Sequence, residues 1–131
     1  MGGGTELGRV RGLGSAGEGA DHWWHQRLTA GFNLLLMVWF ILSIARLPAY
    51  DYGTVTQWLA SAWVAIPMVL LIVSVFYHFR LGLQVLIEDY QHDETRIVAM
   101  VLLNAFTCAA AAIAIFAILK IAFTASTGAV A

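Results

Sequence analysis

The sequence predicts an all-α membrane protein with three transmembrane helices that run up, down and up. Of its 131 residues, 60% are hydrophobic and only 11% are charged, whereas a soluble domain carries about 25% charged residues. Three apolar segments are each long enough to cross a hydrocarbon core of about 30 Å, which takes about 20 residues of helix. The connections between them are short, which makes sequential helices antiparallel neighbours.

Residues 1–21 precede these segments and differ from them in composition. The first twenty residues contain eight glycines and show no apolar periodicity. The stretch also contains acidic residues and leads to no cleavage site, which argues against a signal or transit peptide. We expect an irregular arm over residues 1–21 and a three-helix anchor domain over residues 22–131.

The three predicted spans follow from the apolar runs and their limits. The first covers residues 28–47 and ends before Pro48. The second covers residues 57–88, which is longer than a bilayer requires, so we expect it to tilt or to extend beyond the membrane. Pro67 lies inside this span and is expected to kink it. The third span covers residues 97–123.

Charge and cysteine content exclude several functions. The net charge is −1 and there is one cysteine, Cys108. Binding of nucleic acid by bulk electrostatics is therefore unsupported, and this chain cannot hold an iron–sulfur cluster by itself. The basic residues outside the spans favour a cytoplasmic amino terminus under the positive-inside rule: Arg9, Arg11, Arg27 and Arg96 are expected on the inner side, and Arg46 and Lys120 on the outer side.

His78 is the only histidine that lies deep in a predicted span. Ionisable groups inside a membrane are rare and often functional. The imidazole can coordinate haem iron, or it can form a hydrogen bond that bridges two helices. Gly82, one turn later, favours the haem interpretation because it leaves room beside the helix. A six-coordinate haem would then take its second ligand from another subunit.

The second span ends at Asp89 and Tyr90, where the membrane meets water. A phenol there can donate a hydrogen bond to a quinone carbonyl, or it can serve as an interfacial anchor beside a solvated carboxylate. Arg27, at the start of the first span, can pair with a haem propionate or a quinone oxygen, or it can simply fix the orientation of the helix. We also expect His78 and Arg80 to need a partner subunit, because unsatisfied polar groups in hydrocarbon are costly.

Two motifs carry a resemblance to a known family. The first is the stretch His-Trp-Trp-His-Gln-Arg-Leu-Thr-Ala at residues 22–30. The second places His78, Gly82 and the pair Asp89-Tyr90 at fixed spacing on one helix. Together with the arm over residues 7–16, they make the chain resemble the small hydrophobic membrane anchor, the D-type subunit, of succinate dehydrogenase (respiratory complex II). The resemblance extends from Leu7 to the third span, and the arm resembles the bacterial branch closest to the mitochondrial enzyme.

The resemblance implies a multisubunit assembly. A second, C-type anchor would complete a six-helix heterodimer, with haem b between the two subunits. An iron–sulfur subunit and a flavoprotein with FAD would dock on the inner side. Succinate would be oxidised on the flavoprotein, as in the tricarboxylic acid cycle, and electrons would pass through the clusters to ubiquinone. This chain would contribute no catalytic residue for succinate oxidation, and we expect it in a bacterial inner membrane rather than a mitochondrial one.

The resemblance also assigns residues. His78 corresponds to the axial haem ligand and hence to the ligand of the iron. Tyr90 corresponds to the quinone hydrogen-bond donor, with Asp89 beside it. Arg27 and His22 correspond to contacts with the haem propionates or the quinone pocket. Two alternatives remain open: an anchor of fumarate reductase that works with menaquinone, and a non-catalytic three-helix assembly or transport component in which His78 only bridges helices.

Overall fold

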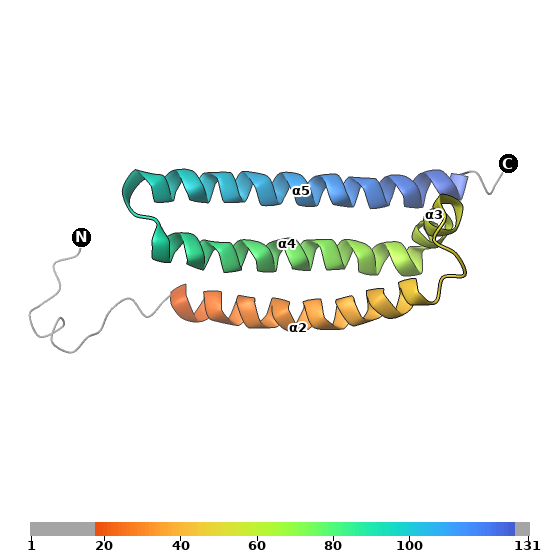
Figure 1. Cartoon of the computed structure of the whole chain (residues 1–131), viewed down its shortest axis with the longest axis horizontal. Helices are drawn as coiled ribbons and strands as arrows, with labels where there is room; N and C mark the ends of the chain where they lie inside the picture. Colours follow the sequence, from red (N-terminus) through yellow and green to blue (C-terminus); the bar gives the residue numbers. More distant parts are fainter. Residues whose placement is uncertain (1–17, 128–131) are drawn as a thin grey trace, which may run out of the picture.

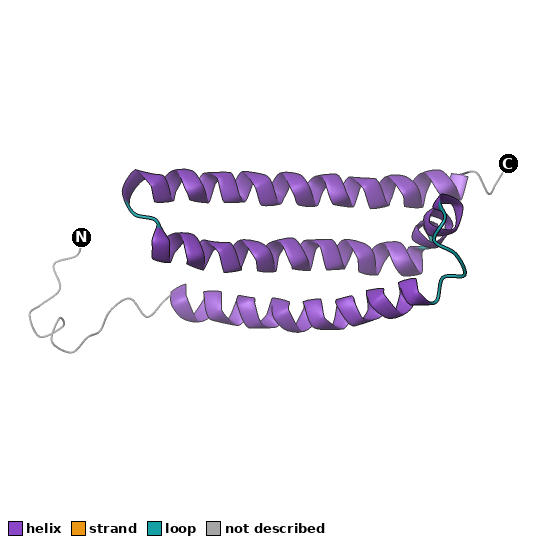
Figure 2. Cartoon of the chain, in the orientation of Figure 1, coloured by secondary structure: helices purple, strands orange, loops and turns teal. Residues whose placement is uncertain are grey.

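The computed structural model describes residues 18–127, and this part of the chain is entirely helical apart from short loops (Figure 2). The helices are α2 (Glu18–Ala45), α3 (Tyr52–Ala60), α4 (Ala62–Tyr90) and α5 (Asp93–Thr127). The three long ones lie side by side with α4 in the middle, and α4 runs opposite to α2 and α5 (Figure 1). The predicted all-α fold with three up-down-up helices is confirmed.

The first and third helices start earlier than the apolar runs. Helix α2 begins at Glu18, inside the arm predicted for residues 1–21, and the rest of that arm lies outside the described residues. Helix α5 begins at Asp93 instead of residue 97 and carries Asp93 and Glu94 in its first turn. Acidic side chains stabilise a helix amino terminus, so this polar turn extends α5 beyond the segment that hydrophobicity marks.

The expectation of one continuous helix over residues 57–88 is wrong at its amino-terminal end. The chain breaks at Ser61, whose backbone is extended, and residues 57–60 belong to the separate helix α3. Leu59 of α3 packs with Ala65 of α4 and Ile118 of α5 in a small buried cluster. The sequence is apolar on both sides of Ser61, so hydrophobicity does not reveal the break. Helix α4 continues through Pro67 to Tyr90.

Helix α3 is fixed at its start by Asp51. The carboxylate accepts hydrogen bonds from the Thr54 hydroxyl at 2.6 Å and from the Thr54 backbone N–H at 3.1 Å. Both bonds favour the ionised form and lower the pKa of the Asp51 carboxyl, the hydroxyl contributing most. The cap is therefore present at neutral pH and is lost only as the pH falls through this lowered pKa.

The three long helices are long and apolar enough to cross a membrane, over Ala20–Ala45, Ala62–Tyr90 and Asp93–Thr124. Few apolar side chains are buried within the described chain, and most large ones are exposed. Helix α2 packs mainly along α4, with one ring contact between Phe40 and Trp58 of α3, so its outer face is open. Exposed apolar surface of this extent is suited to lipid or to another membrane subunit. The chain is a multi-pass membrane protein.

Helices α4 and α5 are joined by a polar pair within the span. The Nε–H of Arg80 donates a hydrogen bond to Oδ1 of Asn104. His78 is also bonded inside the chain, to Thr29 of α2. Each polar residue thus finds one partner within this chain, and their need for a partner subunit stays a prediction. Arg80 still has further N–H groups, so a second subunit or water can contribute.

Replacing Asn104 with leucine is expected to lower the thermal unfolding midpoint of the detergent-purified protein. The change removes the acceptor of a charged donor inside the span, and such hydrogen bonds contribute about 1.5–3 kcal/mol. Asn33→Leu is the matched control, because Asn33 Oδ1 is buried without a partner among the described residues. Replacing Arg80 and Asn104 together with leucine should recover most of the loss. Equal midpoints for Asn104→Leu and Asn33→Leu would show that the pair is not stabilising.

Candidate functional site

A row of polar side chains, here called the polar seam, follows the contact between α2 and α4. On α2 its members recur every three or four residues, so they lie on one helix face. That face is less exposed than the rest of α2 and packs on α4. Polar side chains between membrane helices commonly form hydrogen bonds across the contact. The seam consists of His22, Gln26, Thr29 and Asn33 on α2 and Ser74 and His78 on α4.

The His78 ring is held at the centre of this seam. Its Nδ1 lies 3.0 Å from Oγ1 of Thr29. The same Thr29 oxygen lies 2.7 Å from the backbone carbonyl oxygen of His25 and 3.1 Å from that of Gln26. Thr29 therefore connects the His78 ring to the backbone of α2. Among residues 18–127, no hydrogen-bond partner is found for the second ring nitrogen, Nε2.

Four seam atoms are buried without a partner in the part of the chain described. Buried polar atoms are nearly always hydrogen-bonded, and in hydrocarbon each unsatisfied group costs several kcal/mol. Their concentration on one seam indicates that water, a ligand or another subunit completes the site. The atoms are His22 Nε2, Gln26 Oε1, Asn33 Oδ1 and Ser74 Oγ.

An apolar groove of about 300 Å³ lies between α2 and α4; His78 does not line it, but Thr29, which contacts His78, does. Ligand pockets usually measure about 300–1,000 Å³, so this groove holds only part of a bulky group. Its walls are hydrocarbon except for Thr29, the unpartnered Ser74 hydroxyl and the Tyr77 phenol. The lining residues are Thr29, Phe32, Leu36, Leu70, Val73, Ser74 and Tyr77.

Gly82 does not open this groove. A Cβ atom built on Gly82 would lie 3.5 Å from Nε2 of Gln26, an ordinary contact distance. Gly82 thus faces the Gln26 side chain of α2 at the end of the seam. The Gln26 side chain occupies the space beside Gly82 here, and the interpretation that Gly82 makes room for a macrocycle stays a prediction.

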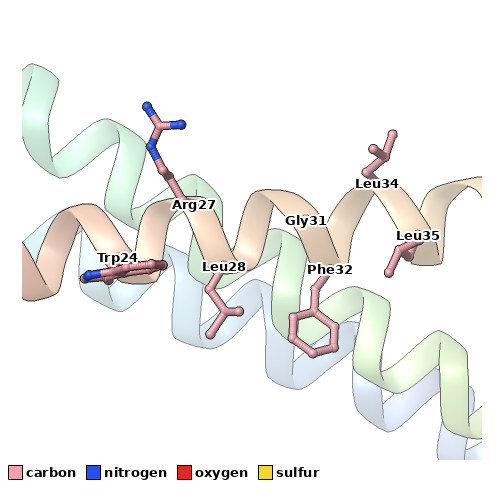
Figure 3. A pocket seen from close by; sticks show the side chains of 7 residues that line it. All are labelled: Trp24, Arg27, Leu28, Gly31, Phe32, Leu34 and Leu35. Carbon is pink, nitrogen blue, oxygen red and sulfur yellow. The ribbon is translucent and has the colours of Figure 1, made fainter.

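Arg27 lies on the outer face of α2, away from the seam. Its guanidinium carbon sits 4.4 Å from the centre of the Trp23 ring, a cation–π arrangement. It lines a second groove, of about 540 Å³, whose floor is open at Gly31, where an added Cβ would meet nothing within 4 Å (Figure 3). His22 and Arg27 therefore do not converge within the chain. The groove is lined by Trp24, Arg27, Leu28, Gly31, Phe32, Leu34 and Leu35.

Asp89 and Tyr90 form the last turn of α4. Tyr90 is 75% exposed and lines a shallow hollow of about 230 Å³ with Leu86, Ile87 and Gln91. The neighbouring Glu88 is already engaged: it accepts from Gln84 at 3.0 Å and lies 3.8 Å from Arg96. No partner is found for the Asp89 carboxylate among residues 18–127. The phenol and one free carboxylate are thus available at this end of the bundle.

The expected site residues gather at one end of the protein. The amino-terminal end of α2 and the carboxyl-terminal end of α4 are neighbours (Figure 1), which brings His22 and Arg27 to the same end as Asp89 and Tyr90. His78 lies twelve residues before Tyr90, roughly 18 Å along the helix at 1.5 Å per residue. In the described residues there is no cluster of three or more His, Cys, Asp or Glu side chains that could hold a metal ion.

Fold and site together define a class of protein: a three-helix membrane subunit that carries an incomplete polar site along its central helix. The family model described as "Succinate dehydrogenase/Fumarate reductase transmembrane subunit" matches residues 1–124. Because this match covers nearly the whole chain, the protein belongs to that family. The resemblance found in the sequence is confirmed.

Curated relatives agree with the family match. A "Succinate dehydrogenase hydrophobic membrane anchor subunit" of Rickettsia bellii (strain RML369-C) is 30% identical over 116 residues, covering 86% of this chain and 93% of the relative. The protein of the same name in Paracoccus denitrificans is 27% identical over 111 residues, covering 85% and 86% respectively. No solved structure matches the chain.

Proposed function

We propose that this chain is the hydrophobic membrane anchor subunit of a succinate:ubiquinone oxidoreductase. It helps to bind haem b and ubiquinone, so that electrons from succinate oxidation reach the quinone pool. The observation that carries the proposal is the His78 ring, held by Thr29 beside an apolar groove in a chain of this family. Succinate is oxidised on a different subunit.

The residues around His78 suit a b-type haem. A ring nitrogen with no other partner is available as an axial ligand, and the groove offers an apolar wall for a macrocycle. When bound, the haem supplies a one-electron redox centre. The second axial ligand comes from the C-type anchor, since His78 is the only histidine deep in a span. Arg27 and His22 lie on different faces of α2, and their proposed roles are a positive charge and a hydrogen bond, respectively, to the propionates or to the quinone pocket.

Tyr90 is the proposed hydrogen-bond donor to a ubiquinone carbonyl. Reduction of a quinone takes up two electrons and two protons, so its site needs donors at the water-accessible edge of the membrane. The exposed phenol and the hollow beside it meet this need. Asp89, which has no partner among the described residues, shapes the pocket and holds or releases protons next to it.

The proposed partners are a C-type anchor, an iron–sulfur subunit and a flavoprotein with FAD. The open apolar face of α2 and the unpartnered atoms of the seam support a second membrane subunit. The protein would lie in a bacterial cytoplasmic membrane with its amino terminus and the Tyr90 end on the cytoplasmic side. The lipid bilayer covers the remaining apolar surface.

Two other functions each have an observation in their favour. The first is an anchor of fumarate reductase, in which electrons pass from menaquinol to fumarate, because the family includes fumarate reductase subunits. The second is a non-catalytic assembly component, since the His78–Thr29 hydrogen bond is also what a simple helix-bridging histidine would form. Haem absorption separates this second function from the proposed one.

Copurification of the tagged chain tests the proposal. The chain is expected to leave the membrane in a stable complex with a flavoprotein, an iron–sulfur protein and one further three-helix subunit, identified by mass spectrometry. The purified complex should show the absorption of a b-type haem. Recovery of the chain as a monodisperse protein without these partners would contradict the proposal.

A further inference from the structure

Three atoms surround the Thr29 hydroxyl: the carbonyl oxygens of His25 and Gln26, and Nδ1 of His78. Their positions determine where the single hydroxyl hydrogen lies. Two oxygens only 2.7 Å apart, as between Thr29 Oγ1 and the His25 carbonyl, need a hydrogen between them. The carbonyl has no hydrogen to give, so the hydroxyl donates to it. The Thr29 oxygen then presents a lone pair to the His78 ring.

The proton on the His78 ring follows from this. Nδ1 lies 3.0 Å from Thr29 Oγ1, which is hydrogen-bond distance. If Nδ1 carried no hydrogen, two lone pairs would face each other at that separation. Nδ1 therefore carries the hydrogen and donates it to Thr29. In a neutral imidazole the lone pair is then on Nε2.

We propose that Thr29 is a positioning residue for His78: it selects the ring tautomer that leaves Nε2 free for metal and fixes the ring plane against α2. The inference rests on the proposed function of His78 as a haem ligand. Histidines that bind metals usually donate their other N–H to a neighbouring acceptor, which orients the ring and raises its basicity. Here the acceptor is a hydroxyl oxygen that is itself polarised by the His25 carbonyl.

Removal of the Thr29 hydroxyl changes the ligand electronically. An acceptor on Nδ1–H makes Nε2 a stronger donor, which favours ferric over ferrous iron. Without it, the midpoint potential of the haem should rise and the ring should rotate more freely. Outer partners of metal ligands typically contribute a 10- to 100-fold effect on metal affinity, so haem content should also fall.

The test uses the complete purified complex with Thr29→Val, which keeps the shape of the side chain and removes the hydroxyl. Thr29→Ser restores the hydroxyl. Thr107→Val is the matched control, since buried Thr107 makes the same bonds to the carbonyls four and three residues earlier, at 2.8 and 3.2 Å respectively, but no hydrogen bond to another side chain is found for it among the described residues. The readouts are haem content, the low-spin electron paramagnetic resonance signal and the midpoint potential by redox titration.

The expected result is a raised potential and an altered low-spin signal, or loss of haem, in Thr29→Val alone. Thr29→Ser and Thr107→Val are expected to keep the wild-type haem content, low-spin signal and midpoint potential. Wild-type values in Thr29→Val, or the same shift in Thr29→Ser or Thr107→Val, would overturn the inference. Failure of the proposed function is a separate result: it would appear as an unchanged haem spectrum in His78→Ala.

Discussion

The complex that contains His78→Ala is expected to lose its low-spin b-type haem signal. The substitution removes the single imidazole deep in a predicted span, and no histidine lines the groove between α2 and α4. The measurement is the reduced-minus-oxidised optical spectrum of the purified complex, normalised to flavin. If another side chain took the place of His78 on the iron, haem binding would be restored only in part. The optical spectrum and the midpoint potential would still change.

His25→Ala is the matched control for this prediction. Its ring lies at the same end of α2, is exposed and stacks edge-on against Tyr77, with ring centres 6.2 Å apart. Its backbone carbonyl, which Thr29 uses, is unaffected by the change. An unchanged spectrum and potential in His78→Ala would rule out ligation and would favour the helix-bridging role.

Tyr90→Phe is expected to slow electron transfer from succinate to ubiquinone while electron transfer from succinate to an artificial dye persists. The dye accepts electrons before the quinone site, so it reports on the flavoprotein and the clusters alone. Loss of one neutral hydrogen bond, about 0.5–1.5 kcal/mol, corresponds to a roughly two- to tenfold fall in quinone reductase activity. The ratio of the two activities in the purified complex is the quantity to measure.

Tyr50→Phe provides the same chemical change at the opposite end of the bundle, in the exposed loop between α2 and α3 (Figure 1). It should leave the ratio at its wild-type value. An equal fall of both activities in Tyr90→Phe would indicate failed assembly, and a wild-type ratio would remove Tyr90 from the quinone site.

The membrane spans were predictable because hydrocarbon imposes a length and a composition on any helix that crosses it. The additional turns of α2 and α5 were not, since Glu18 and Asp93 are polar and the hydropathy pattern marks only the part in lipid. The break at Ser61 was missed for the opposite reason. The residues on both sides of it are apolar, and Leu59 of α3 packs against Ala65 and Ile118 across the break.

The site was predicted from residues with unusual chemistry for a membrane, His78 and Tyr90, and these lie on one helix as expected. The neutral polar residues that complete the seam were missed, because Gln26, Thr29 and Asn33 are individually unremarkable in a membrane helix. Their recurrence every three or four residues was a usable signal. Which helix they face, and hence the hydrogen bond between His78 and Thr29, depends on packing that the sequence pattern does not specify. The sequence pattern likewise did not specify which face of α2 carries Arg27, which lies on the outer face, away from the seam.

Succinate-driven reduction of ubiquinone by the complex purified through this chain tests the proposed function most directly. We expect the complex to oxidise succinate, to reduce ubiquinone, and to contain haem b together with flavin. A complex that reacts faster with menaquinol and fumarate would instead identify a fumarate reductase anchor. A preparation of the chain that neither oxidises succinate nor contains haem would contradict the proposed function.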